Sequence, residues 1–226
     1  MIKNYFKIFY SNCAGSELCN INNIARPGSI LLILFFIAFM SLSAQSQQAT
    51  AQLLKEPATW SFERFALPPS FAPNFSYKGV EELRFSPGMF QKEATDYFTY
   101  AFVAQLDNVK TITRDNIQNY LLEYFRGLCS STAHDRKLTV DTSKITVNTE
   151  PQKGITGNEI IYNAFLNVFG VFADGAPIKL NMEVKVLKDV TSVKTYLVFI
   201  ASPQEKTSEV WKDLYKIQND FKIPAN

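Results

Sequence analysis

The densest cluster of ionisable side chains is Glu81–Arg84, which lies within the stretch Tyr77–Phe90. Two carboxylates beside a guanidinium could bind a polar ligand, or could supply one acid of the pair that glycoside hydrolysis requires. Alternation along a strand places Glu82 and Arg84 on one face of a sheet and Glu81 on the other. One carboxylate is therefore expected on the apolar side, where it needs hydrogen-bond partners.

This cluster leaves two interpretations open. In the first, Glu82 and Arg84 form a same-face pair on a solvated sheet, and Glu81 sits at the strand edge. In the second, the charges line a cleft beneath the Pro87–Phe90 loop, whose methionine and phenylalanine are expected to be exposed. The second interpretation predicts a binding site made of Glu81, Glu82, Arg84, Met89, Phe90 and Tyr100.

Other groups that commonly carry out catalysis are scarce. His134 is the single histidine, and Cys129 is the single cysteine after residue 44. A zinc site needs several such ligands. Cys129 and His134 lie across an expected helix end, and no evident third group would orient them for nucleophilic catalysis. The sequence contains no G-x-S-x-G, P-loop or G-x-G-x-x-G motif. We therefore assign no catalytic residue, no metal and no cofactor from the sequence.

Aromatic residues make up 14% of the chain. We expect most of them to form a large aromatic core, because such side chains bury the most apolar area per residue. The alternatives are a pocket for an apolar or carbohydrate ligand, or a partner surface around Met89 and Phe90.

The first 44 residues have the features of an export signal. Ser29–Met40 is apolar and uncharged, and it is followed by Ser41, Leu42, Ser43 and Ala44, three of which are small. This run is shorter than the ~20 residues that a membrane-spanning helix needs. We expect cleavage near Ala44 and a periplasmic or extracellular protein. The alternative is that residues 29–44 remain attached and anchor the protein to the membrane.

The charge balance limits the expected partners. The chain has 23 basic and 21 acidic residues, and residues 1–44 contain three and one of these, so 20 of each remain. A neutral domain lacks the clustered basic charge that nucleic acid requires. We therefore expect a protein or a small ligand as partner and no nucleic acid. Membrane contact is expected only through the N-terminal apolar segment, if it stays uncleaved.

The remaining pattern predicts one α+β domain over residues 59–226, preceded by a flexible lead-in over residues 45–58. Phe71 and Phe75 are expected to anchor a proline-rich connection. We expect an antiparallel sheet of six or seven strands with two main helices packed on it. The expected helices cover residues 113–132 and 207–221, and the expected strands cover 59–67, 77–85, 96–106, 138–147 (one or two), 159–172, 178–186 and 193–201.

Two of these strands carry informative alternation. In residues 178–186, apolar residues alternate with polar ones, which is typical of a half-buried antiparallel strand. The strand at 159–172 has one apolar face and a mixed second face that includes Asn163 and Asn167. Residues 193–201 are apolar on both faces, which predicts a central position. The polar positions of the half-buried strand are Lys179, Asn181, Glu183 and Lys185.

Several segments resemble a family of exported bacterial proteins without an assigned activity. The resemblance rests on Trp60–Glu63, Leu67–Pro73, Tyr77–Phe90, Tyr97–Phe102, Tyr124–Leu128 and Val210–Lys222. It implies export and a shared fold, and it implies no activity. More distantly, a final strand followed by an amphipathic helix is similar to the Mog1/PsbP-type α+β fold. Members of that group are mostly accessory or binding proteins.

These observations favour an exported domain without catalytic activity that binds a partner or small ligand, as an accessory factor of the cell envelope. One alternative is a hydrolase that uses the carboxylate of Glu81 or Glu82, which would need a cleft and a second acid nearby. Another alternative is a carrier of an apolar ligand, which would need an internal cavity between sheet and helix.

Overall fold

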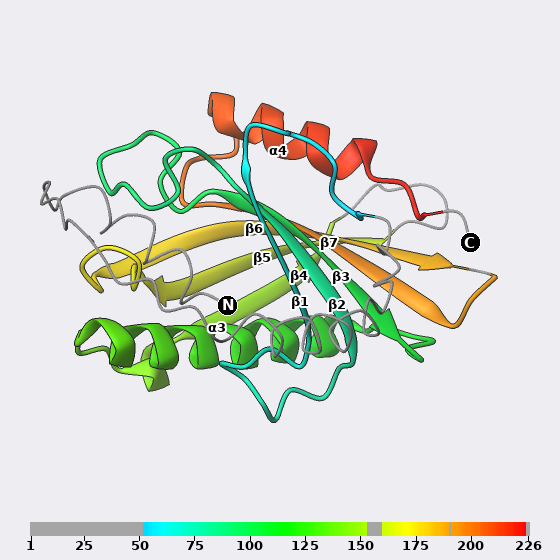
Figure 1. Cartoon of the computed structure of the whole chain (residues 1–226), viewed down its shortest axis with the longest axis horizontal. Coiled ribbons are helices and arrows are strands. Elements are labelled where there is room, and N and C mark those ends of the chain that lie inside the picture. The colour runs from blue at the N-terminus through cyan, green and yellow to red at the C-terminus, as the bar shows by residue number, and fades with distance from the viewer. Residues whose placement is uncertain (1–51, 153–159, 190, 225–226) are drawn as a thin grey trace, which may run out of the picture. The chain divides into compact units, whose positions relative to one another are not determined.

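A seven-stranded antiparallel sheet lies between two helices (Figure 1). The computed structural model describes residues 52–152, 160–189 and 191–224, all of which belong to one compact unit, Ala51–Asn226. The predicted export segment, residues 1–44, lies outside the described residues. No helix in the described part of the chain combines the length and hydropathy needed to cross a membrane.

The chain order of the elements differs from their order in the sheet. The spatial order is β1-β2-β3-β7-β6-β5-β4, so the last strand of the chain is the central one, and β1 and β4 are the edges. The expectation of an antiparallel sheet of six or seven strands with two helices is confirmed. The elements are β1 (Ser61–Leu67), β2 (Gly79–Phe85), β3 (Tyr100–Asp107), α3 (Arg114–Arg136), η1 (Thr142–Lys144), β4 (Thr146–Pro151), β5 (Ile160–Phe169), β6 (Pro177–Asp189), β7 (Lys194–Ser202) and α4 (Glu209–Asp220).

Several predicted boundaries were wrong. The strand expected over residues 138–147 is β4 at Thr146–Pro151, because residues 142–144 form the 3-10 helix η1 ahead of it. The strand expected over 159–172 ends at Phe169, because a turn closed by the Ala173 N–H and the Gly170 carbonyl follows it.

α3 continues past the predicted end at residue 132, because Lys137 adopts the left-handed conformation (φ 57°) that closes a helix, and its N–H donates to the carbonyls of Ala133 and His134. β3 begins at Tyr100 and not near residue 96, because Phe98 has a positive φ of 52° that interrupts extended backbone.

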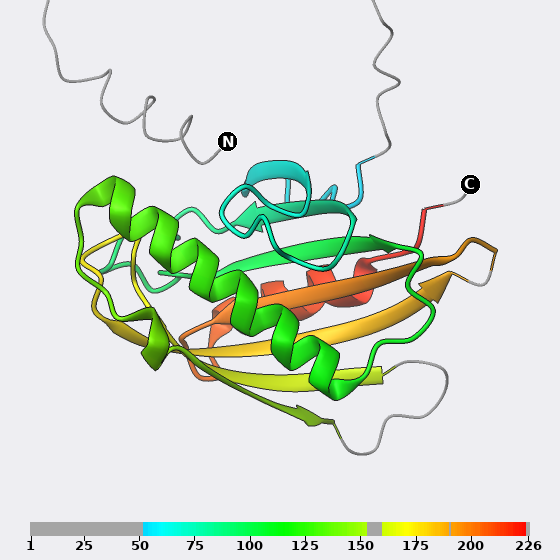
Figure 2. The ribbon, with the colours of Figure 1, turned by 90° about the horizontal axis from the view of Figure 1, so that it is seen from below.

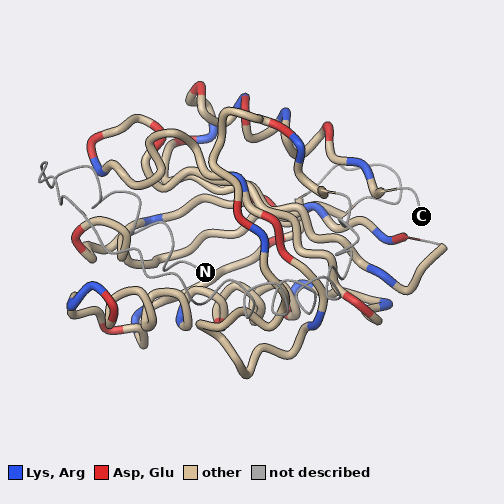
Figure 3. The backbone as a smooth tube through the Cα atoms, in the orientation of Figure 1, with Lys and Arg blue, Asp and Glu red and all other residues tan. Residues whose placement is uncertain are grey.

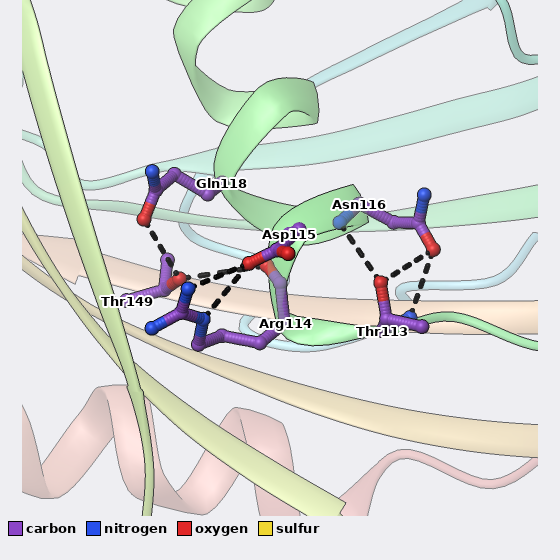
Figure 4. A network of polar contacts seen from close by, with 6 residues as sticks. All are labelled: Thr113, Arg114, Asp115, Asn116, Gln118 and Thr149. Carbon is purple, nitrogen blue, oxygen red and sulfur yellow. Dashed lines mark hydrogen bonds and ion pairs between the residues drawn. The ribbon is translucent and has the colours of Figure 1, made fainter.

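The start of α3 is fixed as the sequence predicts, and it is tied to β4 (Figure 4). The Thr113 hydroxyl accepts a hydrogen bond from the Asn116 N–H at 3.2 Å, and the Asn116 side-chain oxygen accepts one from the Thr113 N–H at 3.0 Å. This reciprocal cap satisfies two backbone donors. The Thr149 hydroxyl of β4 donates to the Arg114 carbonyl and to Gln118. The first turn of α3 is therefore held against the sheet edge.

Each helix covers a different face of the sheet. On the α3 face, the rings of Phe102 and Phe199 stack with centroids 4.1 Å apart, and Tyr120 packs on Phe199 at 5.3 Å. On the α4 face, Trp211 and Leu214 are fully buried in a second apolar cluster. Trp211 is fully buried in this cluster, whereas Val210 beside it is only partly buried. β7 supplies both layers, which explains why it is apolar on both faces.

The connection between β1 and β2, residues 68–78, packs beside α3 (Figure 2). Its two phenylalanines are anchors, as predicted: the Phe71 ring lies 5.0 Å from Tyr124, and the Phe75 ring lies 4.6 Å from Tyr120. The backbone of this connection comes close to α3 at Gly127. A Cβ atom there would lie 2.5 Å from the Phe71 carbonyl oxygen.

Gly127→Ala tests this close approach. Alanine in a helix interior normally stabilises by about 1 kcal/mol relative to glycine. Here the new methyl group meets backbone atoms, so we expect the free energy of unfolding to fall by about 1–3 kcal/mol. Ser130→Ala, at an exposed position of the same helix, is the control and should leave stability unchanged or slightly raised. Denaturant titration measures both, and a stabilised Gly127→Ala protein would contradict this packing.

Candidate functional site

β2 carries the predicted charged cluster and lies one strand inside the sheet edge. It pairs with β1 on one side and β3 on the other, with Glu81 opposite Phe65 and Ala104. Glu81 and Glu82 both have an exposed fraction of 0%, and Arg84 has 6%. Alternation sends Glu81 to the α3 face and the other two to the α4 face, as the sequence predicts. Neither carboxylate lies at the strand edge or on a solvated surface.

Glu81 is held by two tyrosines of α3. The Tyr120 and Tyr124 hydroxyls donate to its two carboxylate oxygens at 2.9 and 2.8 Å. Burial raises the pKa of Glu81 to about 8, although both hydrogen bonds oppose the rise. Burial, together with the neighbouring Glu81, raises the pKa of both tyrosines. A carboxyl group in this position joins β2 to α3, and its protonation state changes near neutral pH.

Glu82 binds the backbone that precedes β1. One of its oxygens accepts hydrogen bonds from the N–H groups of Leu53 and Leu54, at 2.7 and 2.9 Å. Its other oxygen pairs with the Arg64 guanidinium from β1. The predicted same-face pair of Glu82 with Arg84 is therefore not the ion pair that forms. Residues 53 and 54 belong to the predicted flexible lead-in, and they lie against the sheet.

Arg84 binds the same segment through its carbonyl groups. Its guanidinium donates to the Leu54 carbonyl at 3.0 Å, to the Lys55 carbonyl at 3.1 Å and to the Trp60 carbonyl at 3.0 Å. The guanidinium carbon also lies 4.8 Å from the centre of the Phe62 ring. The planar guanidinium presents several N–H donors in a fixed arrangement, so it can bind several carbonyl groups at once. Glu82 and Arg84 therefore fix residues 53–60 across the α4 face.

Met89, which the sequence predicts to be exposed, is buried with an exposed fraction of 1%. Its loop closes on itself through the Phe98 N–H, which donates to the Met89 carbonyl, and through Asp96, which accepts from the Gly88 N–H at 2.8 Å. Phe90 is half-buried against Phe172. The prediction of exposed apolar residues was wrong because these turns direct the methionine inward.

Tyr100, the last of the predicted residues, is buried and stacks on Phe102 at 5.8 Å. The six predicted residues therefore do not share one surface, because the sheet separates Glu81 and Tyr100 from Glu82 and Arg84. Cys129 is also buried, and burial raises the pKa of its thiol to about 11. His134 is exposed. The arrangement of the β2 cluster supports architecture and offers no common binding cleft.

A different polar set is gathered on the α4 side of β4, β5 and β6. The strand registers place Asn148 of β4, Phe165 of β5 and Asn181 of β6 side by side. A parallel row of three residues, one from each strand, lies before and after this row. These nine residues form a grid about 10 Å across the strands and about 13 Å along them. We call it the open face. It consists of Thr146, Asn148, Glu150, Asn163, Phe165, Asn167, Lys179, Asn181 and Glu183.

The centre of the open face is an exposed aromatic ring. Phe165 has an exposed fraction of 45%, and its eight neighbours in the grid are all polar or charged. The opposite side of the same strands is apolar, with Ala164 and Leu166 buried toward α3. α4 packs over β7 and β3, so it reaches this face only at the corner occupied by Glu183.

That corner is a charged network next to α4. The Glu183 carboxylate accepts hydrogen bonds from Lys206 at 2.6 Å and from the Tyr215 hydroxyl at 2.9 Å. Lys206 also donates to the Asn163 side-chain oxygen at 2.6 Å, and its ammonium lies 5.4 Å from the centre of the Trp211 ring. This network fixes one amide of the open face and neutralises Glu183.

Each of the other amides is also oriented by a hydrogen bond from its nitrogen. Asn148 donates to Glu150 at 3.2 Å, Asn167 donates to Thr146 at 2.8 Å, and Asn181 donates to the Gln204 carbonyl at 3.1 Å. A side-chain amide has two N–H donors and an oxygen with two lone pairs, so one bond leaves further capacity. Preoriented amides around an aromatic ring can bind a ligand that has both apolar and hydroxyl groups.

The sequence alone does not reveal the open face, although it contains part of the signal. The alternation in 178–186 places Lys179, Asn181 and Glu183 on one side of a strand, and Asn163 and Asn167 lie on the mixed face of 159–172. What the sequence lacked was the register that aligns these strands with β4. Phe165 was not singled out, because one phenylalanine in a strand gives no sign of its exposure.

A scan against protein-family models gives no match, and a comparison with curated proteins gives none either. Among the residues that the structure describes, no group of three or more His, Cys, Asp or Glu side chains is arranged to hold a metal ion.

Glu81 should make stability depend on pH. Its pKa is higher in the folded protein (about 8) than the ordinary value of 4.5, so the folded state binds more protons between these values. The contribution of Glu81 to the free energy of unfolding is therefore complete below pH 4.5. It is lost as pH rises toward 8, and the free energy of unfolding falls by at most about 1.4 kcal/mol per pH unit. Glu81→Gln should flatten the free energy of unfolding across this range, as measured by denaturant titration at a series of pH values.

The exposed Glu93→Gln variant is the control for this experiment and should keep the wild-type slope. If Glu81→Gln keeps that slope too, another group is responsible for the pH dependence.

Glu82→Gln tests how residues 53–60 are held. The amide has one oxygen where the carboxylate has two, and it cannot pair with Arg64 as a charge. We expect the Leu53 and Leu54 amides to exchange hydrogen about tenfold faster or more, since bonds to a charged acceptor are the stronger ones. Hydrogen-exchange mass spectrometry of the N-terminal peptides measures this. Unchanged exchange beside an unchanged Glu93→Gln control would show that Glu82 does not hold the segment.

Proposed function

We propose that this chain is a binding domain of an exported protein, without catalytic activity of its own, and that it recognises its ligand or partner on the open face. The observation that carries the proposal is Phe165, a ring with 45% exposure at the centre of a polar grid. Single exposed apolar residues are common on protein surfaces. A ring surrounded on all sides by oriented amides and charges is a more specific arrangement, and it suits recognition.

The hydrolase alternative receives less support from the geometry. Glu81 and Glu82 point to opposite faces of the sheet, so they cannot act on one bond as a pair. Each is also fully buried. The Glu81 carboxyl group is satisfied by tyrosine hydroxyls, and the Glu82 carboxylate by backbone N–H groups and Arg64. A catalytic acid must reach the bond that it protonates.

The apolar-carrier alternative is also less well supported. A carrier needs room between sheet and helix, and the centre of the α3 face is filled by stacked rings. Phe102 lies 4.1 Å from Phe199 and 5.8 Å from Tyr124, centroid to centroid. Close packing of this kind leaves few voids.

Hydrogen exchange of the protein, expressed from the full-length sequence, tests the proposed function. The protein is mixed in turn with the protein, polysaccharide and lipid fractions of an envelope preparation from the producing organism. We expect at least one fraction to slow exchange in β4 and β5, because a bound ligand covers that edge of the sheet.

The matched variants are Phe165→Ala and Phe62→Ala, since Phe62 has a similar exposure of 37% and lies on the distant edge strand β1. Protection should disappear in the first variant and persist in the second. If no fraction protects β4 and β5, the open face is not the binding surface.

A further inference from the structure

The open face combines two kinds of group that one class of ligand matches. The exposed Phe165 ring offers a flat apolar surface, and amides lie beside it on both neighbouring strands, at Asn148 and Asn181. A sugar ring has an apolar face formed by its C–H groups and a rim of hydroxyls that both donate and accept. The sugar ring can stack on the face of the Phe165 ring, while the sugar hydroxyls form hydrogen bonds with the asparagine amides.

The charges of the open face are balanced. The face itself has Glu150, Glu183 and Lys179, and Lys206 at its border pairs with Glu183 and offsets the remaining negative charge. Across the described residues, acidic and basic positions are interspersed (Figure 3). A face without net charge does not attract a polyanion such as nucleic acid, which requires concentrated positive charge. The balance instead suits a ligand that is neutral and rich in hydroxyl groups.

The polarity of the face argues against a protein or a lipid surface as its partner. Protein interfaces have an apolar core from which charged residues are depleted, whereas this face has one apolar side chain among nine positions. A lipid surface would require a row of apolar side chains that insert together. The face is also the surface of a sheet, whereas sites that enclose a small molecule are concave. A chain of sugars that lies across the strands fits this surface better than a single enclosed molecule.

We infer that the open face binds a neutral polysaccharide, with Phe165 stacked on a sugar ring and the four asparagines Asn148, Asn163, Asn167 and Asn181 bound to its hydroxyls. This inference rests on the proposed function and adds the class of ligand to it. The network of Glu183, Lys206 and Tyr215 borders the site and holds Asn163 in place.

Affinity electrophoresis and sedimentation with defined polysaccharides test the inference, using protein expressed from the full-length sequence. The probes are the neutral soluble glucans dextran and laminarin, the insoluble polymers cellulose and chitin, and the anionic polygalacturonate. We expect binding to at least one neutral polymer that does not weaken with added sodium chloride. Phe165→Ala should lower the affinity about tenfold or more, because the stacking surface is lost.

Two further variants make the result specific. Phe165→Trp keeps an aromatic surface and should retain binding, and Phe62→Ala removes an equally large exposed ring elsewhere and should bind like the wild type. Circular dichroism and thermal melting check that each variant is folded. Absence of binding to every neutral polymer, binding to polygalacturonate alone, or equal binding by the folded Phe165→Ala protein would each overturn the inference.

The two proposals can fail separately. Protection of β4 and β5 by a protein or lipid fraction, without binding to any neutral polysaccharide, would retain the proposed function and reject the class of ligand. Protection by no fraction, together with no binding, would reject both.

Discussion

The structure depends on how two carboxylates and a guanidinium are buried on one strand. β2 is covered on both faces, so each of its ionisable groups must find hydrogen bonds inside the protein, because a buried polar or charged group without a partner is costly. The α3 side supplies Tyr120 and Tyr124 for Glu81. The α4 side supplies the backbone of residues 53–60 for Glu82 and Arg84. One strand therefore determines where a helix and the chain before β1 must lie.

This requirement also explains why the two faces of the sheet are covered unequally. Residues 53–60 and α4 share one apolar cluster above β3 and β7, which includes Leu54, Trp60 and Trp211. α3 covers the other face and reaches as far as β4. The open face is the part of the α4 side of β4, β5 and β6 that α4 does not cover, and eight of its nine residues are polar. Within the open face, the exposed ring of Phe165 is the one apolar side chain, and our proposal of a binding surface rests on it.

The two polar sets differ in sequence spacing, burial and hydrogen bonding, which separates a structural role from the binding role that we propose. The β2 charges are close in sequence, buried, and satisfied by groups of the fold itself. The residues of the open face come from three strands, are mostly exposed, and are oriented by single hydrogen bonds that leave further capacity. Buried polar groups with complete partners hold a fold together. Exposed and oriented ones can exchange water for a ligand.

The sequence by itself determined the class of fold and most of its elements. Alternation identified the half-buried strand around Leu180 and the doubly apolar central strand, and Thr113 marked the start of α3, because these signals depend on neighbouring residues only. It also determined that Glu81 and Glu82 face opposite ways. Tertiary structure alone decided which groups meet those carboxylates, since the tyrosines and the backbone of residues 53–60 are distant in sequence. It also decided the burial of Met89, which follows from how one loop closes, and the open face, which exists only in the register of β4, β5 and β6.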